Sequence, residues 1–249
     1  MPVQTRDTPL TGGLTLPPPF TLVRLRELGD AFAHAKAIAR VQGAGTLVYV
    51  GRFDLAEFAV VLEPEQPLMR ARRAFYAGMA ALADALAAHA QPETVIGIDW
   101  PDAIAVNGGL VGGGRLAWPQ DVREDDTPPW LVFDAMIRTV SMTGKEPGLN
   151  PLVTALEEEG FGDAMSERVV ESFARHFMLA IDAWQERGFG AVARSYLERL
   201  PREPNLSRTI DDNGDLLIRR VGQEPERLPL LARLSAPAWF DAAAKGPRT

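Results

Sequence analysis

The residues most able to bind a ligand lie between Thr94 and Pro119, a segment that reads TVIGIDWPDAIAVNGGLVGGGRLAWP. Carboxylates, an indole ring, an amide and a guanidinium follow one another here, and a run of glycines lets a ligand approach the backbone. The segment has no lysine, cysteine or histidine, so it lacks the usual nucleophiles and proton-transfer groups. Its chemistry is therefore that of binding, and we predict no catalytic residue in it.

A ligand site is predicted from seven residues of this segment. These residues are Trp100, Asp102, Asn107, Gly112, Gly113, Gly114 and Arg115. The three consecutive glycines indicate either a ligand lying against their strand or tight packing by another element of the protein. Arg115 could face a ligand anion or simply be a solvated strand residue.

Two of the other candidates also have a purely structural interpretation. Trp100 could be a packed aromatic of the core or of a pocket wall, since tryptophan buries a large apolar surface. Asp102 could cap the following hairpin, because aspartate readily bonds to nearby backbone groups. The sequence leaves both alternatives open.

Other reactive patterns are missing from the sequence. His34, His89 and His176 have no regular spacing to one another or to a carboxylate pair, so no metal site is predicted. Residues 211–215 read DDNGD, which lacks the oxygen spacing of a calcium loop and indicates a hairpin turn. No phosphate-binding glycine loop follows a strand, and no serine has the context of a nucleophile elbow.

The elements that would position these residues follow an α+β pattern. Strands are predicted at residues 46–50, 57–62, 94–98, 103–106, 110–118 and 128–142. Helices are predicted at residues 28–41, 68–89, 151–159, 166–187 and 191–200. The second helix carries a stripe at Phe75, Met79, Leu82 and Leu86 that should pack on a sheet. We therefore predict a mixed β-sheet backed by helices.

Composition and the positions of the Pro- and Gly-rich stretches suggest three parts of the chain. Residues 1–19 are rich in Pro, Gly and Thr and form a tail, residues 20–203 form the main domain, and residues 204–249 form a small β-rich C-terminal unit. This last unit is too small to form an adequate core alone, so it should pack on the main domain.

Charge and composition exclude several classes of partner. Of the 249 residues 46% are hydrophobic, which is enough for a buried core, and the net charge of −7 disfavours nucleic acid as a partner. There is no apolar run of 18 residues and no N-terminal signal sequence, so we expect no membrane partner and a cytoplasmic location. The complete lack of cysteine excludes disulfides and cysteine-based zinc sites.

Five short strings, in the same order along the chain, resemble the biotin/lipoate protein ligase family. They are DWPDA at residues 99–103, LVGG at 110–113, TALEEEGF at 154–161, AWQERGF at 183–189 and IDDNGDLLI at 210–218. The first two stand where the family has Lys-Trp-Pro-Asn-Asp and Lys-(Leu/Ile/Val)-x-Gly, with an Asn-Gly hairpin between them. The resemblance covers about residues 20–218.

The resemblance implies a two-step reaction on a biotin or lipoate carboxylate. ATP would activate the carboxylate as an acyl-adenylate, and a lysine of a carrier domain would then take the acyl group. A phosphoryl group in such a site requires positive charge or convergent backbone N–H groups.

The sequence departs from the family where the phosphate would be held. The family's Gly-Arg-Gly-Arg-x-Gly-Arg loop is reduced to Gly51 and Arg52, and the resemblance adds Arg52 to the predicted ligand site. The two motif lysines are replaced by Asp99 and Leu110. The lysines of this chain, Lys36, Lys145 and Lys245, all lie far from the segment in sequence. ATP is therefore not expected as a cofactor, because an adenylate would meet like charge.

The predicted function is binding of a small acyl or biotin-like ligand, or of a biotinyl or lipoyl carrier domain, with the adenylation loop and catalytic lysines lost. The alternative is an active biotin- or lipoate-protein ligase that has rebuilt its cation cluster from Arg52 and Arg115. A third possibility is a scaffold that uses the carrier-docking surface for another partner. The sequence identifies neither the ligand nor the oligomeric state.

Overall fold

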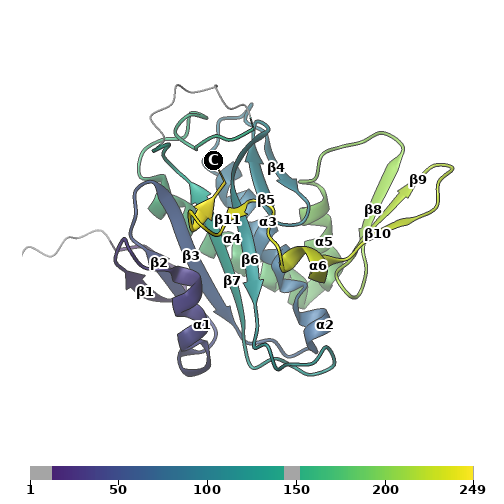
Figure 1. The fold of residues 1–249 in the computed structure, drawn as a ribbon, viewed down its shortest axis with the longest axis horizontal. Coiled ribbons are helices and arrows are strands. Elements are labelled where there is room, and N and C mark those ends of the chain that lie inside the picture. The colour runs from purple at the N-terminus through teal and green to yellow at the C-terminus, as the bar shows by residue number, and fades with distance from the viewer. Residues whose placement is uncertain (1–12, 143–151, 249) are drawn as a thin grey trace, which may run out of the picture.

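The centre of the molecule is a seven-stranded β-sheet with the strand order β1-β2-β3-β7-β6-β5-β4 (Figure 1). The computed structural model describes residues 13–142 and 152–248. The strands are β1 (Thr21–Leu25), β2 (Thr46–Val50), β3 (Leu55–Leu62), β4 (Ile96–Asp99), β5 (Ala103–Val106), β6 (Gly109–Ala117) and β7 (Leu131–Arg138). β1 and β2 are parallel, and every other neighbouring pair of this sheet is antiparallel. The prediction of a mixed sheet is confirmed.

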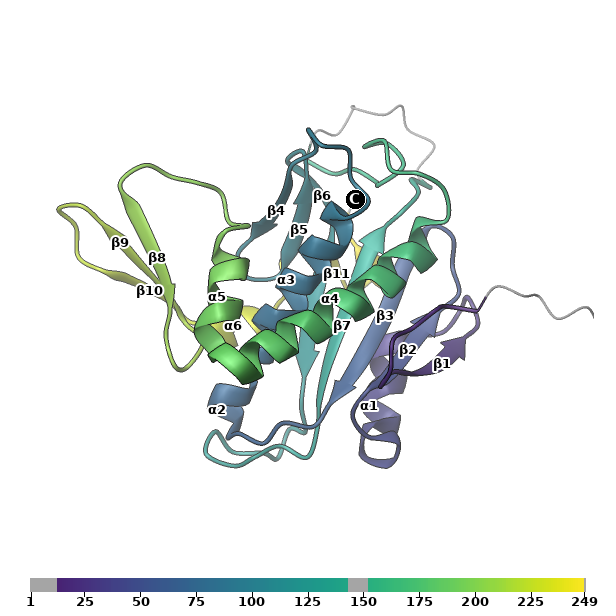
Figure 2. The same cartoon turned by 180° about the vertical axis from the view of Figure 1, so that it is seen from behind.

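One face of the sheet, here called the helical face, is covered by α3 (Ala74–Ala87) and α4 (Met165–Arg187) (Figure 2). α3 is buried almost all round because it packs both on the sheet and on α4. Aromatic rings join the layers, since the ring of Phe133 on β7 stacks on that of Phe173 on α4 at a centroid distance of 5.6 Å. The short helices α2 (Leu68–Ala71) and α5 (Phe189–Leu197) flank this layer.

The opposite face, here called the front face, is covered on one side by α1 (Ala31–Gln42). α1 begins at Asp30, whose side chain accepts a hydrogen bond of 2.8 Å from the Ala33 N–H, and ends at Gly43, which has a φ of 77°. Its alanine stripe packs on the valines of the sheet, so the helix lies close to the strands. The apolar cluster of Leu55, Ala103 and Met136 on the rest of the front face is covered by the C-terminal segment through Trp239.

The C-terminal part of the chain forms a second, three-stranded antiparallel sheet and then returns to the front face. The sheet comprises β8 (Leu206–Ile210), β9 (Leu216–Arg220) and β10 (Glu226–Leu228), and it projects from one side of the molecule (Figure 1). The chain continues through α6 (Leu230–Leu234) to the paired two-residue strands β11 (Phe240–Asp241) and β12 (Gly246–Pro247).

The small sheet is held against α3 by its first hairpin turn. The Tyr76 hydroxyl donates to the Gly214 carbonyl at 2.5 Å, and the Arg72 Nε donates to the Asn213 carbonyl at 3.1 Å. Within the turn, the Asp211 carboxylate accepts from the backbone N–H groups of Asn213 and Asp215. The DDNGD string is therefore a hairpin turn, as predicted.

Three of the predicted elements differ from the structure. The helix predicted at 151–159 is wrong for its described part, because Val153 forms a parallel bridge with Leu110 and turns follow. The helix predicted at 68–89 is interrupted at Arg72 and Arg73, which separate α2 from α3. The strand predicted at 128–142 is shorter in the structure, where β7 covers only residues 131–138. Residues 1–12 of the predicted tail, Pro151 and Lys145 lie outside the described residues.

Within the described residues, no helix is both long enough and apolar enough to cross a membrane.

Candidate functional site

Gly113, at the centre of the predicted site, lies on the front face beneath a tryptophan from the C-terminal segment. A Cβ atom at this position would overlap the Asp102 carbonyl oxygen and lie 2.6 Å from the Trp239 ring. The Trp239 Nε1 donates to the Gly114 carbonyl at 3.2 Å, and the Gly114 N–H donates to the Asp102 carbonyl at 2.9 Å. The space that a ligand would use at Gly113 is thus filled by the chain's own indole.

The two neighbouring glycines serve packing with other elements. A Cβ at Gly112, which lies beside a β-bulge in the β5–β6 pairing, would overlap the Met136 carbonyl oxygen of the neighbouring strand β7. A Cβ at Gly114 would lie 2.6 Å from the Met79 sulfur and 3.1 Å from the Phe133 ring, on the helical face. At all three positions, therefore, the missing side chain admits another part of the protein.

Arg115 lies on the front face between an aspartate and aromatic rings. Its Nη2 is 2.7 Å from Oδ2 of Asp134, a fully buried carboxylate on β7. Its guanidinium also lies 4.5 Å from the Phe32 ring centre and 4.1 Å from that of Phe240. Burial raises the pKa of Asp134 and the ion pair with Arg115 lowers it, and the Asp134 Oδ1 has no hydrogen-bond partner among the described residues.

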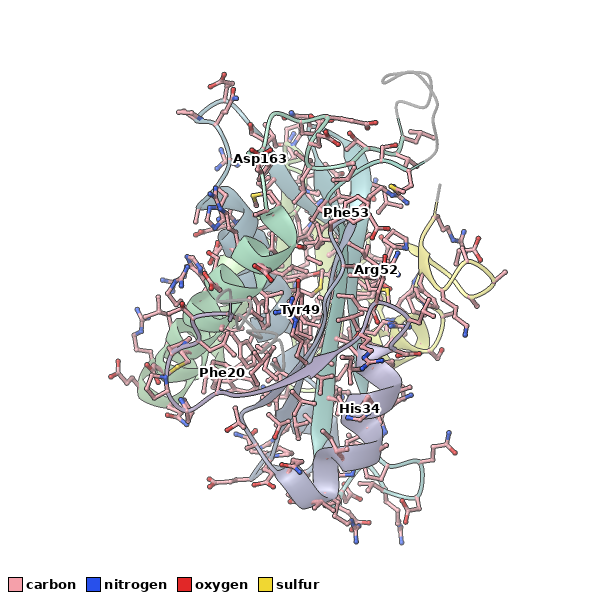
Figure 3. All side chains as sticks on the ribbon, turned by 90° about the vertical axis from the view of Figure 1, so that its left-hand side faces the viewer. Phe20, His34, Tyr49, Arg52, Phe53 and Asp163 are labelled. Carbon is pink, nitrogen blue, oxygen red and sulfur yellow. The ribbon has the colours of Figure 1, made fainter. Side chains whose placement is uncertain are left out.

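Arg52 forms ion pairs with two carboxylates. It lies in the turn between β2 and β3, beside the exposed Phe53 (Figure 3). Its Nη2 is 2.7 Å from Asp54 Oδ2, and its Nη1 is 3.9 Å from Oε2 of the buried Glu57. Burial raises the pKa of Glu57, although its Oε1 accepts a 2.9 Å hydrogen bond from the Ala31 N–H at the start of α1. Both candidate arginines are therefore neutralised by carboxylates of the front face.

Asp102 is a buried member of the site, and its carboxyl faces the C-terminal segment. It accepts a hydrogen bond from the Ala238 N–H, and Arg233 lies close enough to lower its pKa slightly. Burial is the stronger effect and raises the pKa of Asp102 to about 7. Asp102 thus links the β4–β5 turn to the chain that covers Gly113.

Trp100 and Asn107 lie away from the other candidates. Trp100 packs against the core of the helical face, and its Nε1 donates to the Tyr76 hydroxyl at 3.4 Å. Asn107 is in the β5–β6 turn with a φ of 49°, where its side chain accepts from the Val95 N–H and donates to Glu159. The structure therefore brings Asp102, Gly113 and Arg115 together, and Glu57 lies close enough to interact with both Arg115 and Arg52.

The sequence-based prediction missed the residues that complete the front face. Trp239 packs with Leu55, Ala103 and Met136 into a small apolar cluster, which Leu110 and Phe240 border. Arg138, at the end of β7, is buried against the C-terminal segment. The adjacent aromatics Trp239 and Phe240, in a tail of small and polar residues, were the available signal.

The positions expected to hold a phosphate carry no free cation in the described structure. The turn between β2 and β3 has only four residues, 51–54, so no extended loop can close over the sheet there. Asp99 is exposed, and Leu110 packs against the apolar cluster beneath Trp239. Among the described residues, no group of three or more His, Asp or Glu side chains is arranged to hold a metal ion.

The seven-stranded sheet with its layer of helices defines the catalytic fold of biotin protein ligases. The model of the Biotin/lipoate A/B protein ligase family matches residues 16–198, and the chain belongs to this family. The match ends before β8, so the small sheet and the C-terminal segment lie outside it.

Individual relatives agree with this assignment. A "Biotin--[acetyl-CoA-carboxylase] ligase" from Paracoccus denitrificans is 27% identical over 182 residues, which cover 64% of this chain and 72% of that protein. A biotin protein ligase-like protein of unknown function from Silicibacter sp. TM1040 has a TM-score of 0.73 and 29% identity, covering 88% of this chain and 98% of that one. A biotin protein ligase from Aquifex aeolicus, solved with biotin as the R40G mutant, shares the fold at a TM-score of 0.63 and 14% identity, covering 84% and 94%.

Proposed function

We propose that this chain is a member of the family that binds a small acyl or biotin-like ligand, alone or on a carrier domain, without forming an acyl-adenylate. The ligand site is on the front face of the sheet, around Asp102, Gly113 and Arg115. The relatives support the ligand class, because one carries the name of a biotin ligase and another was solved with biotin.

The observation that carries the proposal is the charge at the site. A nucleotide triphosphate is strongly anionic and needs uncompensated cations or preorganised donors where its phosphates lie. Here Arg115 is paired with Asp134, and Arg52 is paired with Asp54 and close to Glu57. Phosphate added beside Arg52 and Arg115 would meet guanidinium groups that carboxylates already pair with, at a cost in electrostatic free energy.

The alternative, an active ligase that uses these arginines, has less support. It would need Arg52 or Arg115 to leave a carboxylate partner during each catalytic cycle. Leaving Asp134 unpaired and buried would be costly, since this carboxylate is fully inaccessible to water. The four-residue β2–β3 turn would also have to supply the closure that the family obtains from a longer loop.

Calorimetric titrations with biotin, lipoate and ATP, each added to the full chain, test the proposal. We expect biotin, lipoate or a carrier domain bearing one of them to bind in the absence of ATP, and we expect no heat from ATP alone. The ligase from Paracoccus denitrificans serves as the positive control under the same conditions. Micromolar affinity for ATP would contradict the proposal, as would the failure of every acyl ligand and carrier to bind.

A further inference from the structure

The C-terminal strap, defined here as residues 237–248, lies across the part of the front face that α1 leaves open. It contains β11 and β12, which lie in front of β6 and β7 (Figure 1). Of its residues, only Trp239 and Pro247 are buried, and the pairing of β11 with β12 is two residues long. The strap is therefore attached at a few points and has little structure of its own.

The first attachment is an aromatic ring over the glycine strand. Trp239 is 1% exposed, its Nε1 donates to the Gly114 carbonyl, and its ring contacts the position where Gly113 lacks a Cβ atom. Phe240 follows and lies over the guanidinium of Arg115. The strap thus places a planar bicyclic ring at the position predicted for the ligand.

The second attachment is a pair of acceptors on a buried arginine. The Nη2 of Arg138 donates to the Pro247 carbonyl at 2.9 Å and to the Arg248 carbonyl at 2.8 Å, while its Nη1 donates to the Thr154 carbonyl at 3.3 Å. Two of the three oxygens around this guanidinium come from the strap. If the strap left, Arg138 would present free donors at the edge of the face, and a carboxylate would satisfy them.

Together the two attachments have the chemistry of a ligand with a ring at one end and an oxygen pair at the other. We propose that the strap is a displaceable internal occupant of the front-face site, and that the ligand which displaces it is a ring-bearing carboxylate bound over Gly113 and by Arg138. This inference rests on the proposed function and adds to it a competing segment and a subsite. The strap lies outside the part of the chain that the family model matches.

Competition lowers the apparent affinity of any ligand, because the ligand binds only the fraction of molecules with the strap released. Weakening the strap should therefore strengthen ligand binding. Trp239→Ala removes the main apolar contact of the strap and leaves Arg138 and the β6 strand unchanged. Ala242→Ser, at an exposed strap residue, is the matched control.

The experiment uses the full chain and two probes, indole-3-propionate and its neutral amide, with affinity measured by calorimetry. We expect Trp239→Ala to bind the acid at least tenfold more tightly than the wild type does, which is about 1.4 kcal/mol, and Ala242→Ser to match the wild type. The acid should bind at least tenfold more tightly than the amide, and Arg138→Gln should abolish this preference. If Arg138→Gln does not fold, the comparison of acid and amide in Trp239→Ala decides the point.

Hydrogen exchange then shows whether the strap leaves. The Arg248 N–H donates to the Trp239 carbonyl at 2.8 Å, so the closed strap should protect that amide. In the wild type saturated with the acid, we expect this protection to be lost. Binding with the strap still protected, equal affinities of wild type and Trp239→Ala, or no binding to either would overturn the inference.

The same series separates this inference from the proposed function. If the indole acid opens the strap but biotin, lipoate and carrier domains do not bind, the strap inference stands and the proposed function fails. If biotin or lipoate binds while the Arg248 amide stays protected, the proposed function stands and the strap inference fails.

Discussion

At the scale of single residues, the glycines of β6 decide how the front face is built. Each removes a side chain that would collide with a neighbour, and at Gly113 the neighbours are the Asp102 carbonyl and the Trp239 ring. The sequence predicted either close packing or a ligand at this strand, and the strap explains how both can hold at one position. In the closed molecule the Trp239 ring occupies the position over Gly113, and the ligand is proposed to replace this ring.

Gly113→Val should destabilise the fold, because the new side chain collides with a backbone oxygen that cannot turn away. Overpacking of this kind costs about 1–3 kcal/mol or more, and the thermal melt should move down accordingly. Gly190→Ala on α5 is the control, since no atom lies within 4 Å of its added Cβ. A Gly113→Val protein with the melting temperature of the wild type would contradict this expectation and show that the β4–β5 turn can move away from β6.

The polar candidates were only partly predictable. Asp102 and Arg115 could be placed near the glycines because they lie on the same hairpin in sequence. Their partners could not, since Asp134 lies on the next strand and Ala238 follows more than 130 residues after Asp102. The sequence also grouped Trp100 with the site, but its ring faces the opposite side of the sheet.

At the scale of elements, the periodicity of apolar residues predicted most strands and helices. Contacts with residues distant in sequence account for the elements that were predicted wrongly. The predicted helix 68–89 breaks where Arg72 and Arg73 turn toward the C-terminal hairpin, with Asn213 accepting from the first and Asp212 facing the second. The segment from Leu152 pairs with β6 through a long-range bridge. Neither contact leaves a pattern in its own stretch of sequence.

The C-terminal unit should depend on the main domain for its stability, and the main domain should lose stability without it. A chain ending at Glu203 would leave Tyr76 and Arg72 without their acceptors in the hairpin and would expose the apolar cluster beneath Trp239. We expect its melting temperature to fall by roughly 5 °C or more, if the chain stays soluble. A soluble truncated chain with the melting temperature of the full protein would contradict this expectation.

At the scale of the whole molecule, the buried carboxyl of Asp102 should make stability depend on pH. The pKa of Asp102 is raised to about 7 from an ordinary value of 3.8. Between about pH 4 and pH 7 the folded protein therefore binds more protons than the unfolded chain does. The free energy of unfolding contributed by this group then falls as the pH rises through that range and levels off above it.

Urea unfolding at pH 5 and pH 8 measures this effect. We expect the wild type to be more stable at pH 5, and we expect Asp102→Asn to raise stability at pH 8 by about 2 kcal/mol with little change at pH 5. The asparagine keeps an acceptor for the Ala238 N–H but carries no charge. A wild-type protein that is more stable at pH 8, or an Asp102→Asn variant with an unchanged pH profile, would refute the assignment.

The whole fold relates this chain to ligases, while its charge distribution separates it from their phosphate chemistry. The most direct measurement is the transfer of labelled biotin or lipoate to a carrier domain in the presence of ATP, with the Paracoccus denitrificans ligase as the positive control. The account predicts that the carrier stays unlabelled with this chain, because Arg52 and Arg115 are already neutralised by Asp54, Glu57 and Asp134. ATP-dependent labelling of the carrier lysine would contradict the central claim.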